Sequence, residues 1–151
     1  MDPVGLAAVV VVLVAGMTFG WWRRRRDGRV ADSAVKSKDQ DMTDAVRLEP
    51  ALLERLGVEP AAVTLLQFST AFCAPCRAVR RVSSEVATLL PAVRHVEVDA
   101  ESHLDEVREL GIWRTPTLLI IDAEGREVRR ATGVPTKPHL IAALAELLPT
   151  P

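Results

Sequence analysis

The chain contains a long apolar run near its N-terminus, followed at once by a cluster of positive charge. Val4 to Trp22 carries no charged residue, and four arginines occupy positions 23–26. A helix over this run is about 28 Å long, close to the thickness of a bilayer's hydrocarbon core, and the arginine flank is typical of the cytoplasmic side. We therefore predict a single-pass transmembrane anchor over residues 1–26 that places the following domain in the cytoplasm.

Two other interpretations of this run are a cleaved secretory signal and a helix buried in a soluble core. A secretory signal carries its positive charge before the apolar segment, whereas only Met1 to Pro3 precede this one. A buried helix needs more protein around it than the rest of the chain provides. The anchor remains the favoured prediction.

The stretch from Asp27 to Asp44 mixes small, polar and charged residues and contains few apolar ones. A segment of this composition buries too little apolar surface to offset the entropy of ordering. We predict a flexible linker over residues 27–44, which lets the following domain move near the membrane surface.

Residues 45–151 alternate short apolar runs with segments of helical periodicity. The apolar runs predict strands at Ala45–Leu48, Val63–Phe68, Val93–Val98, Thr117–Asp122 and Glu127–Thr132. The periodic segments predict helices at Pro50–Leu56, from Cys73 to about Pro91, at Glu101–Leu110 and at His139–Leu148. This order combines crossover connections with one hairpin, so we predict an α/β domain with a central mixed sheet flanked by helices.

Composition and charge exclude several classes of function. The chain has 19 Lys and Arg against 20 Asp and Glu, a net charge of −1, which argues against nucleic acid as a partner. Its only two cysteines, Cys73 and Cys76, are too few and too close together to staple a small disulfide-rich fold. A disulfide bond between them is therefore expected to take part in a chemical reaction and not to stabilise the fold.

The two cysteines form a Cys-x-x-Cys motif at a predicted junction between strand and helix. At a helix N-terminus, unpaired N–H groups and the helix dipole favour a thiolate, so we expect a low pKa and an attacking role for Cys73. Cys76 lies one turn into the helix and is the resolving sulfur, and Pro75 suits a first turn. A zinc half-site is the alternative, but His95 and His103 lack the spacing of a paired-histidine site.

In this context the domain resembles the thioredoxin family over about Ala45 to Leu148. The resemblance rests on Phe68, Cys73, Pro75, Cys76, Gly111-Ile112, Thr115-Pro116-Thr117, Gly125 and Gly133. It implies a thioredoxin-like fold and thiol–disulfide exchange through a mixed disulfide, with no metal or organic cofactor. It also implies a cis peptide bond before Pro116 and a substrate-binding role for the backbone of Thr115.

The sequence departs from the family pattern around the motif. Phe72 stands where the family usually has Trp, and Ala74-Pro75 replaces the commoner Gly-Pro. We predict that Phe72, Ala74, Pro75 and Trp113 join Thr115 and Pro116 in binding substrate, although ordinary packing of Trp113 is an equal alternative.

Gln67 replaces a buried Asp of the family, and His95 replaces its partner Lys. Gln67 cannot act as a base, so proton removal from Cys76 is expected to use water, His95 or Glu97, which alternation puts on the same strand face as His95. The arginines of the following helix, Arg77, Arg80 and Arg81, are expected to form a solvated face.

Together these features predict a membrane-tethered, thioredoxin-like reductase of protein disulfides. Its expected partners are disulfide-containing proteins, an upstream thiol reductase that supplies electrons, and the membrane, but not nucleic acid. The rival hypotheses are an extracytoplasmic thiol oxidant or reductant, and a noncatalytic binding module that keeps the fold without turnover.

Overall fold

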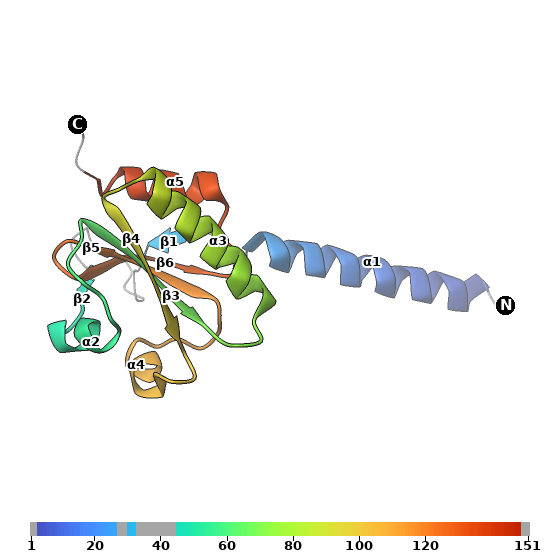
Figure 1. Cartoon of the computed structure of the whole chain (residues 1–151). Helices are drawn as coiled ribbons and strands as arrows, with labels where there is room; N and C mark the ends of the chain where they lie inside the picture. The colour runs from blue at the N-terminus through green and yellow to red at the C-terminus, as the bar shows by residue number, and fades with distance from the viewer. Residues whose placement is uncertain (1–2, 27–29, 33–44, 149–151) are drawn as a thin grey trace.

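A computed structural model describes residues 3–26, 30–32 and 45–148 and builds a mixed sheet between two layers of helices (Figure 1). In chain order the elements are α1 (Pro3–Arg26), β1 (Val30–Asp32), β2 (Val46–Arg47), α2 (Pro50–Arg55), β3 (Val63–Ser69), α3 (Ala74–Leu89), β4 (Val93–Asp99), α4 (Leu104–Glu109), β5 (Thr117–Asp122), β6 (Arg126–Thr132) and α5 (Lys137–Ala145). The predicted α/β architecture of the domain is confirmed.

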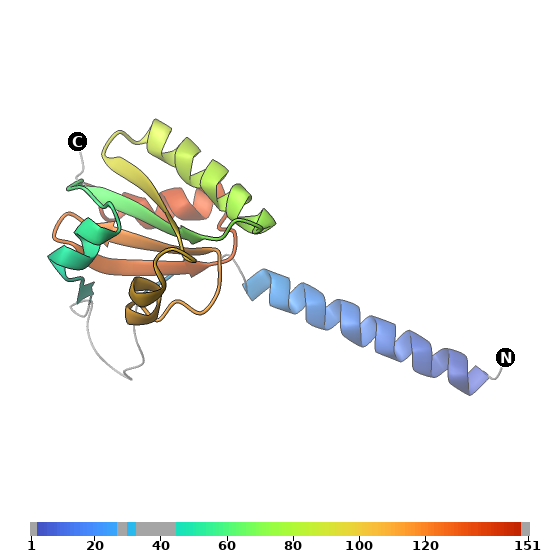
Figure 2. The ribbon, with the colours of Figure 1, turned by 60° about the horizontal axis from the view of Figure 1, so that its bottom comes forward.

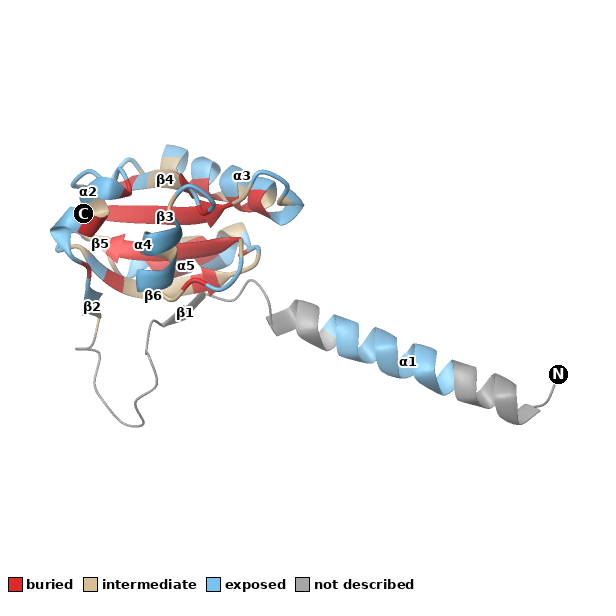
Figure 3. Ribbon diagram, turned by 90° about the horizontal axis from the view of Figure 1, so that it is seen from below, coloured by how far each residue is buried: buried red, intermediate tan, exposed pale blue. Residues whose placement is uncertain are grey.

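The sheet has the strand order β1-β6-β5-β3-β4, with β2 also pairing with β6. Strands β3 and β4 are parallel and are joined through α3, whereas β5 is antiparallel to both β3 and β6. Strand β3 is central and buried over its whole length, in agreement with its unbroken apolar sequence (Figure 3).

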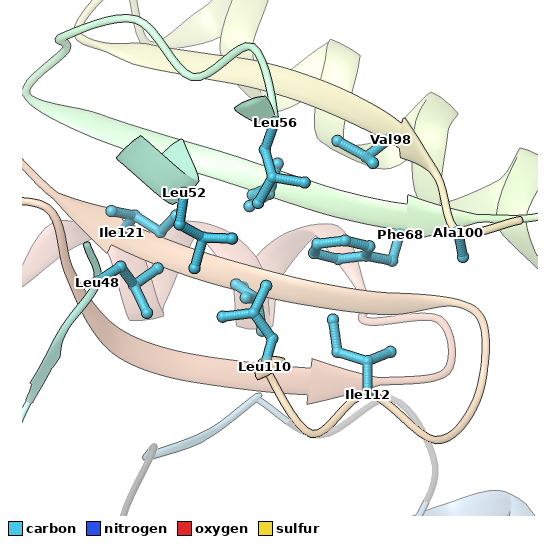
Figure 4. Close-up of a cluster of buried hydrophobic side chains, with 11 residues drawn as sticks. Leu48, Leu52, Leu56, Phe68, Val98, Ala100, Leu110, Ile112 and Ile121 are labelled. Carbon is cyan, nitrogen blue, oxygen red and sulfur yellow. The ribbon is translucent and has the colours of Figure 1, made fainter. Parts of the chain in front are cut away.

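Helices cover both faces of the sheet, α3 and α5 on one and α2 and α4 on the other (Figures 1 and 2). Alternate residues of β3 therefore contribute to two separate cores: Leu66 and Phe68 pack towards α2, and Val63 and Leu65 pack towards α3. Figure 4 shows the first core, in which Phe68 lies among Val98, Ala100, Leu110 and Ile112. This packing fixes the end of β3, from which the chain enters the motif.

Helix boundaries differ from the prediction where side chains bind the backbone. Helix α4 begins at Leu104, three residues later than predicted, because the Asp99 carboxylate first accepts hydrogen bonds from the Glu101 N–H and the Ser102 hydroxyl. Helix α5 begins at Lys137, two residues earlier than predicted, because the Thr136 hydroxyl accepts from a first-turn N–H.

The predicted linker over residues 27–44 is wrong for Val30–Asp32, which forms β1. This strand pairs antiparallel with residues 129–131 of β6. Its order comes from backbone hydrogen bonds along a sheet edge, which require no apolar burial of its own. The remaining predicted linker residues, 27–29 and 33–44, lie outside the described residues.

The predicted helix over the apolar run is confirmed as α1, which extends away from the sheet (Figures 1 and 2). Side chains 10–21 are described, and all of them are exposed (Figure 3). Within the part of the chain that the structure describes, no helix combines the length and apolar character needed to cross a membrane. The transmembrane assignment of residues 1–26 stays a prediction from sequence.

An ion pair in β6 depends on an irregularity of the sheet. The register of β5 against β6 shifts between Ile120 and Ile121. The extra residue in β6 brings Glu127 and Arg130 to the same face, whereas residues three apart in a regular strand point to opposite faces. Arg130 Nε and Nη2 donate to the two oxygens of the buried Glu127 carboxylate over 2.7 and 2.8 Å.

Candidate redox site

The Cys-x-x-Cys motif lies where β3 leads into α3, as predicted. Cys73 is the N-cap residue of α3, and Pro75 occupies the first turn, where a missing N–H costs nothing. Cys73 and Cys76 form a disulfide, with their Cα atoms 5.2 Å apart. Cys76 is only 1% exposed, whereas Cys73 is half-buried and therefore the more accessible sulfur.

The backbone of α3 donates a hydrogen bond to the first cysteine. The Cys76 N–H lies 3.1 Å from Cys73 Sγ. This donor and the positive end of a 16-residue helix both favour negative charge on Cys73 once the disulfide opens. The arrangement suits Cys73 as an attacking thiolate and as a good leaving group.

The predicted substrate-binding residues gather at one end of the sheet. The Thr115–Pro116 bond is cis, as the resemblance implied. The Thr115 hydroxyl lies 3.4 Å from the Thr70 hydroxyl, which brings the loop before β5 against the loop before Cys73. Pro116 is buried, whereas Ala74 and Pro75 are exposed.

Two aromatic side chains in these loops have little protein around them. Phe72 is 100% exposed and Trp113 is 92% exposed. Ordinary packing, the alternative considered for Trp113, is therefore wrong. An exposed aromatic residue on each loop is typical of a surface that contacts another molecule.

Gln67 forms a buried connection beneath the second cysteine. Its amide nitrogen donates to the Cys76 carbonyl oxygen over 3.1 Å and to Glu97 Oε1 over 3.4 Å. Its amide oxygen lies 3.2 Å from His95 Nε2, so this ring nitrogen carries the hydrogen. The other ring nitrogen, Nδ1, then accepts from the Ser84 hydroxyl over 3.3 Å. Both nitrogens of the imidazole are thus engaged.

Glu97 occupies the other end of this hydrogen-bonded group. The Ser69 hydroxyl donates to its Oε1 over 2.7 Å, and Arg80 pairs with both carboxylate oxygens through Nε and Nη2. Mainly through its hydrogen bond, Arg80 holds the pKa of Glu97 below its ordinary value. The pKa of His95 is also lowered, chiefly by burial. At neutral pH the group therefore contains an ionised Glu97 and a neutral His95.

Arg80 differs from its prediction as part of a solvated helix face, because it pairs with Glu97. The Arg80 side chain is indeed 54% exposed, but it is long enough to reach from α3 to the carboxylate on β4. Arg80 follows Cys76 by four residues, so the two lie on one side of the helix, and this spacing was the available signal. Ser69 and Ser84 also contact this hydrogen-bonded group, through Glu97 and His95, but the spacing of these serines along the sequence gave no comparable signal.

An open pocket of about 400 Å³ adjoins the disulfide. Its lining includes both cysteines, Arg77, Arg80, Glu97 and Asp99. Of the three predicted proton-handling residues, Gln67, His95 and Glu97, only Glu97 contributes to this lining. In the described segments, no cluster of three or more His, Cys, Asp or Glu side chains has an arrangement that could hold a metal ion.

A comparison with protein-family models matches residues 54–146 to the family described as Thioredoxin. The chain belongs to the thioredoxin family. Thioredoxin of Chlamydia trachomatis is 29% identical over 84 residues, which are 56% of this chain and 81% of the relative. Thioredoxin H-type of Fagopyrum esculentum is 32% identical over 69 residues, which are 46% of this chain and 59% of the relative.

Solved thioredoxin structures share the fold at lower sequence identity. Thioredoxin f2 of Chlamydomonas reinhardtii superposes with a TM-score of 0.55 at 20% identity, over 70% of this chain and 98% of that one. Thioredoxin NaTrxh of Nicotiana alata gives 0.56 at 18% identity, over 75% and 100%. With the Cys73–Cys76 disulfide, family membership makes the chain a thioredoxin-fold thiol–disulfide oxidoreductase.

Proposed function

We propose that this chain reduces disulfide bonds in protein partners. In the reduced protein, the Cys73 thiolate attacks one sulfur of the partner's disulfide, and the partner's other sulfur leaves as a thiolate that takes up a proton. Cys76 then attacks Cys73 Sγ in the mixed disulfide, which releases the partner's second thiol and leaves the Cys73–Cys76 disulfide. Two electrons pass from the two cysteines to the partner.

The single observation that carries this proposal is the position of Cys73 Sγ at the start of α3. It accepts the Cys76 N–H over 3.1 Å and is more accessible than Cys76, whose residue is 1% exposed. A partner disulfide can therefore reach Cys73, while Cys76 remains close enough to resolve the intermediate. This asymmetry supports separate attacking and resolving roles.

The partner is proposed to bind over the two loops that meet at Thr70 and Thr115. An extended segment beside the partner's disulfide would contact the exposed rings of Phe72 and Trp113 and the backbone of Thr115. The 3.4 Å contact between the two threonine hydroxyls supports this arrangement, because it holds both loops next to Cys73.

Glu97 is the residue we assign to accept the Cys76 proton through water in the adjoining pocket. Gln67 has no proton to exchange at neutral pH, and both ring nitrogens of His95 are engaged by Gln67 and Ser84. Glu97 shares the pocket with Cys76 and is ionised. Glu97→Gln is expected to alter the pH–rate profile of disulfide reduction, and a profile altered by His95→Leu instead would transfer the role to His95.

The membrane anchor, the cytoplasmic orientation and the upstream thiol reductase remain predictions from sequence. Their support is the uncharged run from Val4 to Trp22 with its arginine flank, and the need for a source of electrons. A reporter fused after Pro151 tests the orientation. Activity of an export-dependent reporter would favour the extracytoplasmic alternative.

Turnover of insulin disulfides by the full chain, with dithiothreitol as reductant, tests the proposed reaction. Wild type should accelerate insulin reduction, Cys73→Ser should abolish the acceleration, and Cys76→Ser should accumulate a mixed disulfide with the substrate. If wild type is no faster than Cys73→Ser, the chain is better described by the noncatalytic alternative.

A further inference from the structure

The open pocket of about 400 Å³ also gives access to the disulfide, next to the surface formed by the two loops. Both cysteines line this pocket together with Thr70 and Ala71 of the loop before Cys73, whereas the exposed aromatic rings, Thr115 and Pro116 do not. A volume of this size suits a small molecule and is too small for a folded protein. The pocket is therefore suited to a small molecule that reacts with the sulfurs, whereas the surface of the two loops is suited to a protein.

The charges around the pocket indicate what this reactant carries. Arg80 and Glu97 compensate each other through their ion pair. Asp99 also lines the pocket and keeps its negative charge, but its carboxylate oxygens are directed into the loop after β4, where they accept the Ser102 hydroxyl over 2.6 Å and the Glu101 N–H over 3.1 Å. Arg77 is exposed and forms no ion pair within the described ranges, so its guanidinium is available to a ligand. A planar guanidinium matches a carboxylate particularly well.

We propose that a small thiol bearing a carboxylate enters this pocket and reduces the Cys73–Cys76 disulfide, with its carboxylate paired to Arg77. The inference rests on the proposed function, since it names a source of the electrons that the reduction of a partner's disulfide consumes. Under this proposal Arg77 selects the reductant, whereas the sequence predicted for it only a place on a solvated helix face.

Two thiol molecules supply the electrons in two exchange steps. The first thiolate attacks Cys73 Sγ, the accessible sulfur, and Cys76 leaves and takes up a proton. A second thiolate then attacks the small-molecule sulfur of this mixed disulfide. The products are the small disulfide and Cys73 as a thiolate, a leaving group stabilised by the Cys76 N–H. Each cycle oxidises two thiols and reduces one protein disulfide.

The test measures how fast three thiols reduce the oxidised full chain at low ionic strength, by acid quenching and alkylation of the new cysteines. The probes are 3-mercaptopropionate, neutral 2-mercaptoethanol and cationic cysteamine. Because each thiol has its own reactivity, the informative quantity is the ratio of variant to wild-type rate for the same thiol. The variants are Arg77→Gln and the matched control Arg81→Gln, which lies exposed on the same helix outside the pocket.

Arg77→Gln should slow 3-mercaptopropionate about two- to five-fold, as expected for one partly exposed charge pair. It should leave 2-mercaptoethanol unchanged and speed cysteamine, and Arg81→Gln should leave all three rates unchanged. If Arg77→Gln and Arg81→Gln slowed 3-mercaptopropionate equally, the effect would come from the general surface charge. If Arg77→Gln slowed 2-mercaptoethanol as much as 3-mercaptopropionate, the substitution would act on the disulfide itself. Either result overturns the proposal. The insulin assay with neutral dithiothreitol tests the proposed function separately, because it does not depend on the carboxylate.

Discussion

Glu97→Gln provides the sharpest test of the hydrogen-bonded group beneath Cys76. The substitution keeps the size and shape of the side chain but removes its charge. It therefore weakens the pairing with Arg80 and turns the 2.7 Å bond from Ser69 into a bond between neutral groups. We expect the folded state to lose stability without losing its packing.

The cost can be worked out from these contacts. Hydrogen bonds to charged groups stabilise by about 1 kcal/mol more than neutral ones, which gives the loss at Ser69. The pairing with Arg80 is bidentate, but the Arg80 side chain is 54% exposed and screened by solvent, so it contributes about 1 kcal/mol. The free energy of unfolding at pH 7 should therefore fall by about 2 kcal/mol in total.

The difference between wild type and Glu97→Gln should depend on pH. The folded-state pKa of Glu97 lies below the ordinary value of 4.5, so the unfolded chain protonates first as the pH falls. The stabilisation is fully present above pH 4.5 and is lost as the pH falls through the folded-state pKa. Urea unfolding of both oxidised proteins, repeated from pH 7 to pH 3, should show the two stabilities converging in acid.

Glu59→Gln is the matched control, because Glu59 pairs with Arg94 at the surface, with side chains 71% and 49% exposed. Its effect should stay within about 0.5 kcal/mol at pH 7. A gap between wild type and Glu97→Gln that stays constant down to pH 3, or a control that costs as much, would refute the reasoning.

Three further predictions concern stability, each measured by urea unfolding. The Ser83 hydroxyl is fully buried and has no hydrogen-bond partner among the described residues, so Ser83→Ala should stabilise by about 1–2 kcal/mol; a loss would mean that the hydroxyl is satisfied. Arg130→Leu takes the bidentate partner from the buried Glu127 carboxylate and should cost about 3 kcal/mol, whereas an unchanged midpoint would contradict that role. Burial lowers the folded-state pKa of His95, so stability should fall as the pH drops below about 6.5; His95→Gln should reduce this slope, and an identical slope would reject its assignment to His95.

Local pattern was enough to predict most of the domain. The unbroken apolar sequence of β3 predicted a buried strand, and the start of α3 followed from Pro75 and the cysteines. Alternation along β4 also predicted that His95 and Glu97 share a face, which their common contacts with Gln67 confirm. These features depend on residues that are close together in the sequence, so the spacing of apolar and polar residues predicts them.

Features that depend on distant partners could not be predicted in this way. The order of Val30–Asp32 comes from the edge of β6, about a hundred residues further along the chain, and its composition gives no sign of it. Arg80 belongs to an exposed helix face by pattern, yet its guanidinium reaches Glu97 on a neighbouring strand. Long side chains with a charged end make such contacts without changing the periodicity.

The ion pair of Arg80 and Glu97 also explains how a carboxylate can lie near a sulfur that must ionise. An uncompensated negative charge beside Cys76 would disfavour its thiolate, the form that resolves the mixed disulfide. Pairing with Arg80 offsets that charge while leaving Glu97 on the pocket that Cys76 shares. Because this pair is itself nearly neutral, Arg77 is the arginine of the pocket lining that has no ion-pair partner among the described residues, which is the property that the small-thiol proposal requires.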